Sequence, residues 1–137
     1  MLWAVLCETL YLKLIPADLS FKREVFELND YFLKLGVYPN EDEEYFVPQV
    51  FENVFAAAVI EREFEWSENF INKYGPTLHP NVRQNQINYC LGVLNFKTKK
   101  YEKSLEHLSK VEQCDINMKI NLRFYTLVNY IEMKHYE

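Results

Sequence analysis

Two short segments decide the fold: Asn88-Tyr-Cys-Leu-Gly92, which leads to Phe96, and Tyr101-Glu-Lys-Ser-Leu105, which leads to Leu108. Apolar residues in both segments recur three or four positions apart, which is the spacing of an amphipathic helix. The lysine-rich residues 97–100 between them are typical of a polar turn. We therefore expect two helices that lie side by side as an antiparallel pair.

Small residues mark the place where these two helices would meet. Gly92 and Ser104 have little or no side chain, so we expect the helices to approach each other closely there. Tyr101 and Leu108 are expected to fill the space between this pair and the next. In the first helix the pattern is a small residue followed by an aromatic residue, Gly92 and Phe96. In the second helix the order is reversed, with Tyr101 followed by Ser104.

Weaker copies of this pattern lie on both sides. The earlier copy consists of Phe55-Ala-Ala-Ala-Val59 and Phe64-Glu-Trp-Ser67, and its turn reads as one residue shorter. The later copy contains Leu127, Tyr130, Ile131 and Tyr136. The aromatic residues Phe64, Tyr101 and Tyr136 lie 37 and 35 positions apart. A period of about 34 residues indicates stacked helix pairs.

The pattern resembles the tetratricopeptide repeat. The helical spacing of apolar residues along the chain predicts an all-α fold. The resemblance implies a right-handed α-α superhelix (solenoid) of about three and a half antiparallel helix pairs with seven helices. It places repeats at 47–84 and 85–118 and a truncated repeat at 119–137, with a divergent pair at 1–46, all in one domain of residues 1–137. The order of residues is also similar to that of uncharacterised helical-repeat proteins of bacteria, notably of the Bacteroidetes group. Leu127 departs from the family pattern, because it replaces the expected small residue.

Helix breakers set the expected helix boundaries. We expect helices over residues 2–14, 21–35, 48–60, 64–74, 80–96 and 101–111, and a last one from about residue 117 to the end of the chain. Pro16 closes the first helix, and Gly36 ends the second as a left-handed terminator. Pro48 and Pro80 suit the first turns of the third and fifth helices.

Composition bounds the function. The chain has 137 residues with 2 Trp, 10 Tyr and 10 Phe but only 3 Gly, so it can bury a core without metals or disulfides. Its formal net charge of −5 disfavours nucleic acid and anionic membranes as partners, because both attract basic surfaces. Cys7, Cys90 and Cys114 form no paired motif, and no signal peptide or spanning segment is evident. We therefore expect a cytoplasmic protein with reduced thiols.

No set of residues predicts catalysis, a cofactor or a metal. His79, His107 and His135 fall in a loop, on a helix and at the chain end, and share no helix face. The acidic run Glu41–Glu44 lacks the spacing and the glycine of a calcium loop. Cys90 lies on an apolar helix seam, which favours an inert thiol. We accordingly expect a protein that is not an enzyme.

The first helix of each pair would line a groove, according to the resemblance. Its candidate partner-binding residues are Asn53, Gln86, Tyr89, Val93, Lys97, Asn121, Phe124 and Val128, with Val50, Ala57, Ile60 and Glu132 on the same faces. A mixture of aromatic, aliphatic and amide groups suits an extended peptide or a helix. The alternative is that Tyr89, Val93, Phe124 and Val128 pack only between repeats.

These residues predict a non-catalytic scaffold that binds a protein or peptide partner on its concave helix face. The alternative function is a regulatory or sensor module of a larger transcription-control or signalling protein. The repeat pattern also predicts that the last pair is cut short at Tyr136-Glu137, which would leave one apolar face of the last helix uncovered. Such a face favours self-association.

Overall fold

The computed structural model describes residues 20–39, 42–112 and 114–134, and this part of the chain is all-helical. It contains six α-helices, one short 3-10 helix and no strand; a single isolated bridge joins Phe46 and Leu78. The helices are α2 (Ser20–Lys34), α3 (Pro48–Ile60), α4 (Phe64–Tyr74), η1 (Gly75–Thr77), α5 (Pro80–Lys97), α6 (Tyr101–Leu108) and α7 (Ile116–Lys134). The all-α prediction is confirmed; the helix predicted at 2–14 lies outside the described residues.

Prolines and a glycine set several helix ends as predicted. Pro48 and Pro80 are the first residues of α3 and α5, where a missing backbone N–H costs no helical hydrogen bond. Gly36 has a φ of +71°, and the N–H of Val37 donates to the carbonyl oxygen of Phe32 at 2.9 Å. This is the Schellman arrangement, which satisfies the last carbonyl groups of a helix.

One predicted boundary is wrong. The periodicity extends the sixth helix to Val111, but α6 ends at Leu108. The chain then forms a turn in which the N–H of Val111 donates to the carbonyl oxygen of Leu108 at 3.2 Å. Val111 is nevertheless buried, so its apolar character reflects packing of the turn rather than continuation of the helix.

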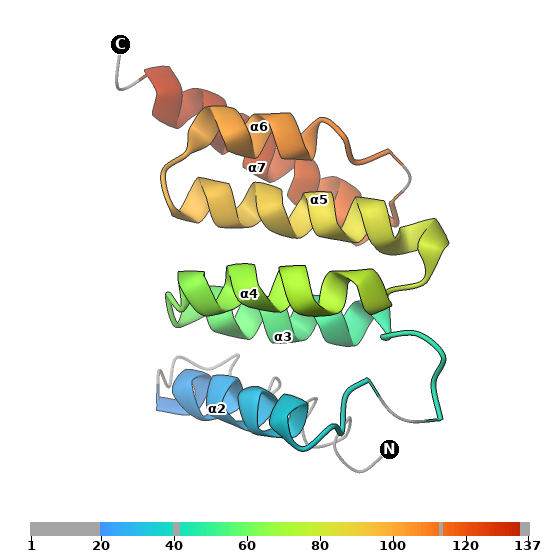
Figure 1. Ribbon diagram of the computed structural model, residues 1–137. Helices are drawn as coiled ribbons and strands as arrows, with labels where there is room; N and C mark the ends of the chain where they lie inside the picture. Colours follow the sequence, from blue (N-terminus) through green and yellow to red (C-terminus); the bar gives the residue numbers. More distant parts are fainter. Residues whose placement is uncertain (1–19, 40–41, 113, 135–137) are drawn as a thin grey trace.

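Consecutive helices run antiparallel and form a row, with α2 at one end and α6 and α7 at the other (Figure 1). The helix α3 packs against α2, α4 and α5, and α5 packs against α3, α4, α6 and α7. The helices α3, α5 and α7 thus follow one another along one side of the row, whereas α4 and α6 cover the other side (Figure 1).

The two turns that reverse the chain within α3–α4 and α5–α6 have the same geometry. Arg62 and Lys99 both have a positive φ, of 62° and 61°. In each turn, the next residue donates its N–H to a carbonyl oxygen five positions back. The turns therefore have equal length, and the shorter first turn expected from the sequence is wrong. Counted from the turn, the residue of α3 that corresponds to Gly92 is Phe55.

Aromatic rings fill the core between α3, α4 and the segment that precedes α3. Phe46, Phe51 and Phe70 are almost fully buried, and the ring centroids of Phe51 and Phe70 lie 4.7 Å apart. Phe46 meets the rings of Phe51 and Tyr74 edge to face, at 5.6 and 5.9 Å. Burying each such side chain contributes about 1.5–3 kcal/mol, so this cluster is a main source of stability.

Close contacts hold α5, α6 and α7 together. A Cβ atom on Gly92 would lie 2.5 Å from the Leu108 side chain, so only glycine fits at this crossing. The Ser104 hydroxyl donates to the Gly92 carbonyl oxygen at 2.7 Å, and Asn129 Nδ2 donates to the Ser104 hydroxyl at 2.9 Å. The predicted close approach at Gly92 and Ser104 is confirmed, but Leu108 fills space inside this pair rather than between pairs.

Candidate binding surface

A cavity of about 180 Å³ opens between α3, α5 and α7. Tyr89, Val93 and Lys97, three of the predicted groove residues, follow one another along α5 and line it together. Its remaining walls come mainly from apolar residues of α3. The full set is Glu52, Phe55, Ala56, Val59, Ile60, Tyr89, Val93, Lys97 and Tyr125.

The polar groups of this cavity differ between its two ends. At the Glu52 end, burial raises the pKa of the carboxyl group, and a hydrogen bond with Gln86 opposes that rise. Burial also raises the pKa of the Tyr89 phenol, with a further contribution from the negative charge of Glu52. Lys97 at the other end is exposed. The cavity therefore joins an acidic end and a basic end by an apolar wall.

The other predicted groove residues are spread over several environments. Gln86 is buried beside Glu52, and Asn121 is exposed while its side chain forms a hydrogen bond with the Tyr89 phenol. Asn53 is half-buried and accepts a hydrogen bond from Gln49 at 3.1 Å. None of these three residues lines the cavity itself.

On α7, the side chain that reaches the cavity is Tyr125, not the predicted Phe124. Phe124 is 56% exposed, and Val128 is half-buried without lining the cavity. Neighbouring residues of a helix point about 100° apart, so a shift of one position moves a side chain to another face. The predicted alignment placed Leu127 at the position of Gly92, and this placement produced the shift.

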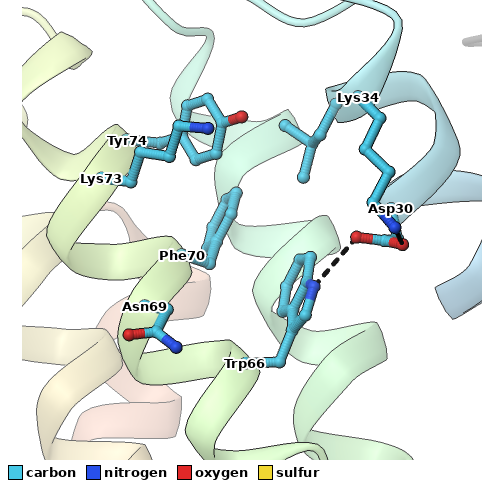
Figure 2. Close-up of a pocket in the computed structure, with 8 residues that line it drawn as sticks. Asp30, Lys34, Trp66, Asn69, Phe70, Lys73 and Tyr74 are labelled. Carbon is cyan, nitrogen blue, oxygen red and sulfur yellow. Dashed lines mark hydrogen bonds and ion pairs between the residues drawn. The ribbon is translucent and has the colours of Figure 1, made fainter.

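A second hollow, of about 390 Å³, lies between α2 and α4 (Figure 2). Trp66, Phe70 and Tyr74 form its aromatic wall, and the Trp66 and Phe70 rings stack at a centroid distance of 5.3 Å. The Trp66 Nε1 atom donates to Asp30 Oδ1 at 3.0 Å, and Lys34 Nζ lies 2.6 Å from Asp30 Oδ2. Asp30 thus fastens α2 to α4, and both of its oxygens are engaged.

This hollow was not predicted from the sequence. Trp66, Phe70 and Tyr74 recur every four residues along α4, which indicates a shared face. However, the bond between Trp66 and Asp30 spans 36 positions, and no local spacing indicates it.

The histidines and Cys90 lie apart in separate environments. His79 packs against the Tyr45 ring at a centroid distance of 4.7 Å, and His107 Nδ1 lies 3.2 Å from Asn88 Oδ1. Cys90 is fully buried, and burial raises the pKa of its thiol. Within the described residues, no group of three or more His, Cys, Asp or Glu side chains could hold a metal ion. Of the earlier candidates, His135 and Glu41 lie outside these residues.

No family model, curated protein or solved structure matches the chain. None of the helices in the described ranges combines the length and the apolar character needed to cross a bilayer.

Proposed function

We propose that this chain is a non-catalytic protein-interaction module that binds a peptide or protein partner in the cavity between α3, α5 and α7. The architecture we propose for it is the right-handed solenoid of tetratricopeptide-like helix pairs. The alternation of α3, α5 and α7 with α4 and α6, and the two matching turns at Arg62 and Lys99, support that architecture.

The single observation that carries the proposed function is the joint presence of Tyr89, Val93 and Lys97 in one cavity with Tyr125. Sites for small molecules and cofactors usually measure about 300–1,000 Å³. A cavity of about 180 Å³ is smaller, and suits one large apolar side chain of a partner. Such buried anchors dominate the free energy of many protein interfaces.

The charges at the two ends would set the direction of the partner. The Glu52 carboxylate is partly desolvated. A Lys or Arg next to the anchor would pair with this carboxylate and so compensate for the lost solvation. Lys97 would attract an acidic residue on the other side of the anchor. We therefore expect partner segments with the order basic, large apolar, acidic along the cavity.

A peptide library displayed on phage and selected against the parent chain tests this proposal. The plugging variant is Ala56→Phe, because Ala56 is half-buried in the cavity wall and a ring there would fill the cavity. The control is Glu24→Lys, on the exposed surface of α2.

We expect selected peptides to share a large apolar anchor with charged neighbours. Their affinity should fall at least about tenfold for Ala56→Phe, since displacing an anchor costs more than 1.4 kcal/mol. Binding to Glu24→Lys should be unchanged. Peptides that bind the parent and Ala56→Phe equally well would contradict the cavity as the site.

A further inference from the structure

The last helix exposes an unusual amount of apolar surface. The described residues expose ten large apolar side chains, and six of these ten lie on α7. Each of the six is between 45% and 69% exposed. We call them the outer stripe: Ile116, Ile120, Phe124, Leu127, Tyr130 and Ile131.

The outer stripe lies opposite the packed face of α7. The side chains that pack into the protein are those of Met118, Leu122, Tyr125 and Asn129, which recur four, three and four positions apart. With 3.6 residues per turn, the two sets point in nearly opposite directions. A helix that is apolar on both faces is normally covered on both.

A close-packed helix like α6 does not fit on this stripe. The helix α6 reaches α5 only because Gly92 has no side chain, since a Cβ there would meet Leu108 at 2.5 Å. The helix α7 contains no glycine, alanine or serine. A helix that covers it must pack through large side chains, at an interaxial distance of about 8–10 Å.

We propose that a second copy of this chain covers the outer stripe, with the two α7 helices antiparallel about a two-fold axis near Phe124. Counted from Ile116, the residues Ile120, Phe124, Leu127 and Ile131 follow at steps of four, four, three and four. The order is nearly the same when read backwards, with the aromatic ring at the centre. Ile116 of one copy therefore meets Ile131 of the other, and Ile120 meets Leu127, as a self-complementary interface requires.

The size of the outer stripe fits a weak but specific dimer. At roughly 200 Å² for each large side chain, the exposed fractions amount to roughly 700 Å² per copy. The pair would bury roughly 1,400 Å², inside the range of about 1,200–2,000 Å² of specific interfaces. The area of roughly 700 Å² on one copy also exceeds the largest apolar patch of a typical monomer, which is about 300–600 Å².

The cationic side chains of α7 predict how salt acts on this dimer. Lys119, Arg123 and Lys134 are exposed on α7; at about 100° per residue, Lys119 lies beside Tyr130 at one edge of the stripe, whereas Arg123 and Lys134 point within it. In the antiparallel pair, Lys119 of one copy lies next to Tyr130 of the other, and the two Arg123 side chains meet near the axis. The like charges of the two Arg123 side chains repel each other. Salt screens this repulsion, so a higher salt concentration should strengthen the dimer. An acidic partner helix held by the same cations would instead dissociate as salt rises.

Sedimentation equilibrium over a range of salt concentrations tests the pairing. The parent should form a reversible dimer that tightens with salt, and Phe124→Lys should weaken it at least tenfold. The matched control is Tyr31→Lys on α2, because both aromatic side chains are 56% exposed. Tyr31→Lys should leave the dimer intact. The proposal would be overturned by a parent that stays monomeric, by a parent that forms oligomers larger than a dimer, or by equal weakening of the dimer in both variants.

A thiol cross-linker of short reach tests the orientation. Both test variants carry Cys7→Ser and Cys114→Ser, and the buried Cys90 is retained. Ile116→Cys mixed with Ile131→Cys should give a cross-linked dimer, whereas either variant alone should give little. Efficient cross-linking of Ile116→Cys to itself would show parallel helices and overturn the antiparallel arrangement.

Discussion

The helices α5 and α7 present opposite kinds of surface on the faces where each could receive a covering helix. The face of α5 that α6 and the segment after it cover carries small and polar residues: Asn85, Asn88 and Gly92 lie along it. The outer stripe of α7 is exposed and consists of large apolar side chains. The buried face is thus the more polar of the two.

Each polar group on the α5 face has a specific partner. Asn88 Oδ1 lies 3.2 Å from His107 Nδ1, and the Gly92 carbonyl oxygen accepts from Ser104 at 2.7 Å. Because these groups are paired, burying them costs little, and the missing side chain of Gly92 lets the backbones approach. The outer stripe has neither small residues nor polar pairs, so it suits an interface between large side chains.

The largest effect on stability should come from disrupting the packing of α5 against α6. Gly92→Leu places a branched side chain where even a Cβ atom would lie 2.5 Å from Leu108. We expect a loss of about 1–3 kcal/mol in the free energy of unfolding, which is typical of overpacking. Urea denaturation measures this loss, with Lys103→Leu on the exposed side of α6 as the control. A Gly92→Leu protein as stable as the parent would contradict the close packing of α5 and α6.

A smaller effect should come from protonating His107, which lies in the contact between α5 and α6, at low pH. Burial, and then the positive charge of Lys110, lower the pKa of His107 from its ordinary value near 6.5. The unfolded chain therefore binds this proton more readily than the folded protein does. Stability is complete above about pH 6.5 and falls as the pH drops from there through the lower pKa of the folded state.

Melting temperatures measured between neutral and mildly acidic pH check this dependence. The comparison variant is His107→Gln, which can still donate to Asn88 but does not titrate. We expect the melting temperature of the parent to fall more steeply below pH 6.5 than that of His107→Gln. Parallel curves for the two proteins would show that His107 does not destabilise the covered face when protonated.

The smallest effect on the isolated chain should come from the outer stripe. Leu127 is 60% exposed, so Leu127→Ser removes few contacts within one copy. At concentrations where the chain is monomeric, we expect the free energy of unfolding to change by less than about 0.5 kcal/mol. Chemical denaturation at high dilution measures this change. A loss as large as that of Gly92→Leu would mean that Leu127 belongs to the core of a single copy.

The sequence predicted the helices between Pro48 and Lys97 because prolines and polar turns mark their ends. It failed at the end of α6, since Val111 continues the apolar spacing although the backbone has already turned. Such a boundary depends on tertiary packing, which the local spacing does not record.

The candidate binding surface was predicted in part for a related reason. Along α5, Gly92 marks the close approach to α6, and the repeat pattern counted from it placed Tyr89, Val93 and Lys97 together, as the cavity confirms. Along α7, both faces are apolar at helical spacing, so the sequence could not distinguish Tyr125 in the cavity from Phe124 in the outer stripe. The presence of apolar residues on both faces of α7 thus prevented the prediction of Tyr125. The same property indicates that α7 has a second apolar contact.

Hydrogen–deuterium exchange of the parent chain at low and high protein concentration tests the contrast between the two faces most directly. Association slows exchange in the helices that it stabilises. We predict that backbone amides of α7 (Ile116–Lys134) exchange more slowly at high concentration, whereas those of α5 (Pro80–Lys97) stay unchanged. Exchange in α7 that does not depend on concentration, or slowing confined to α5, would contradict the account.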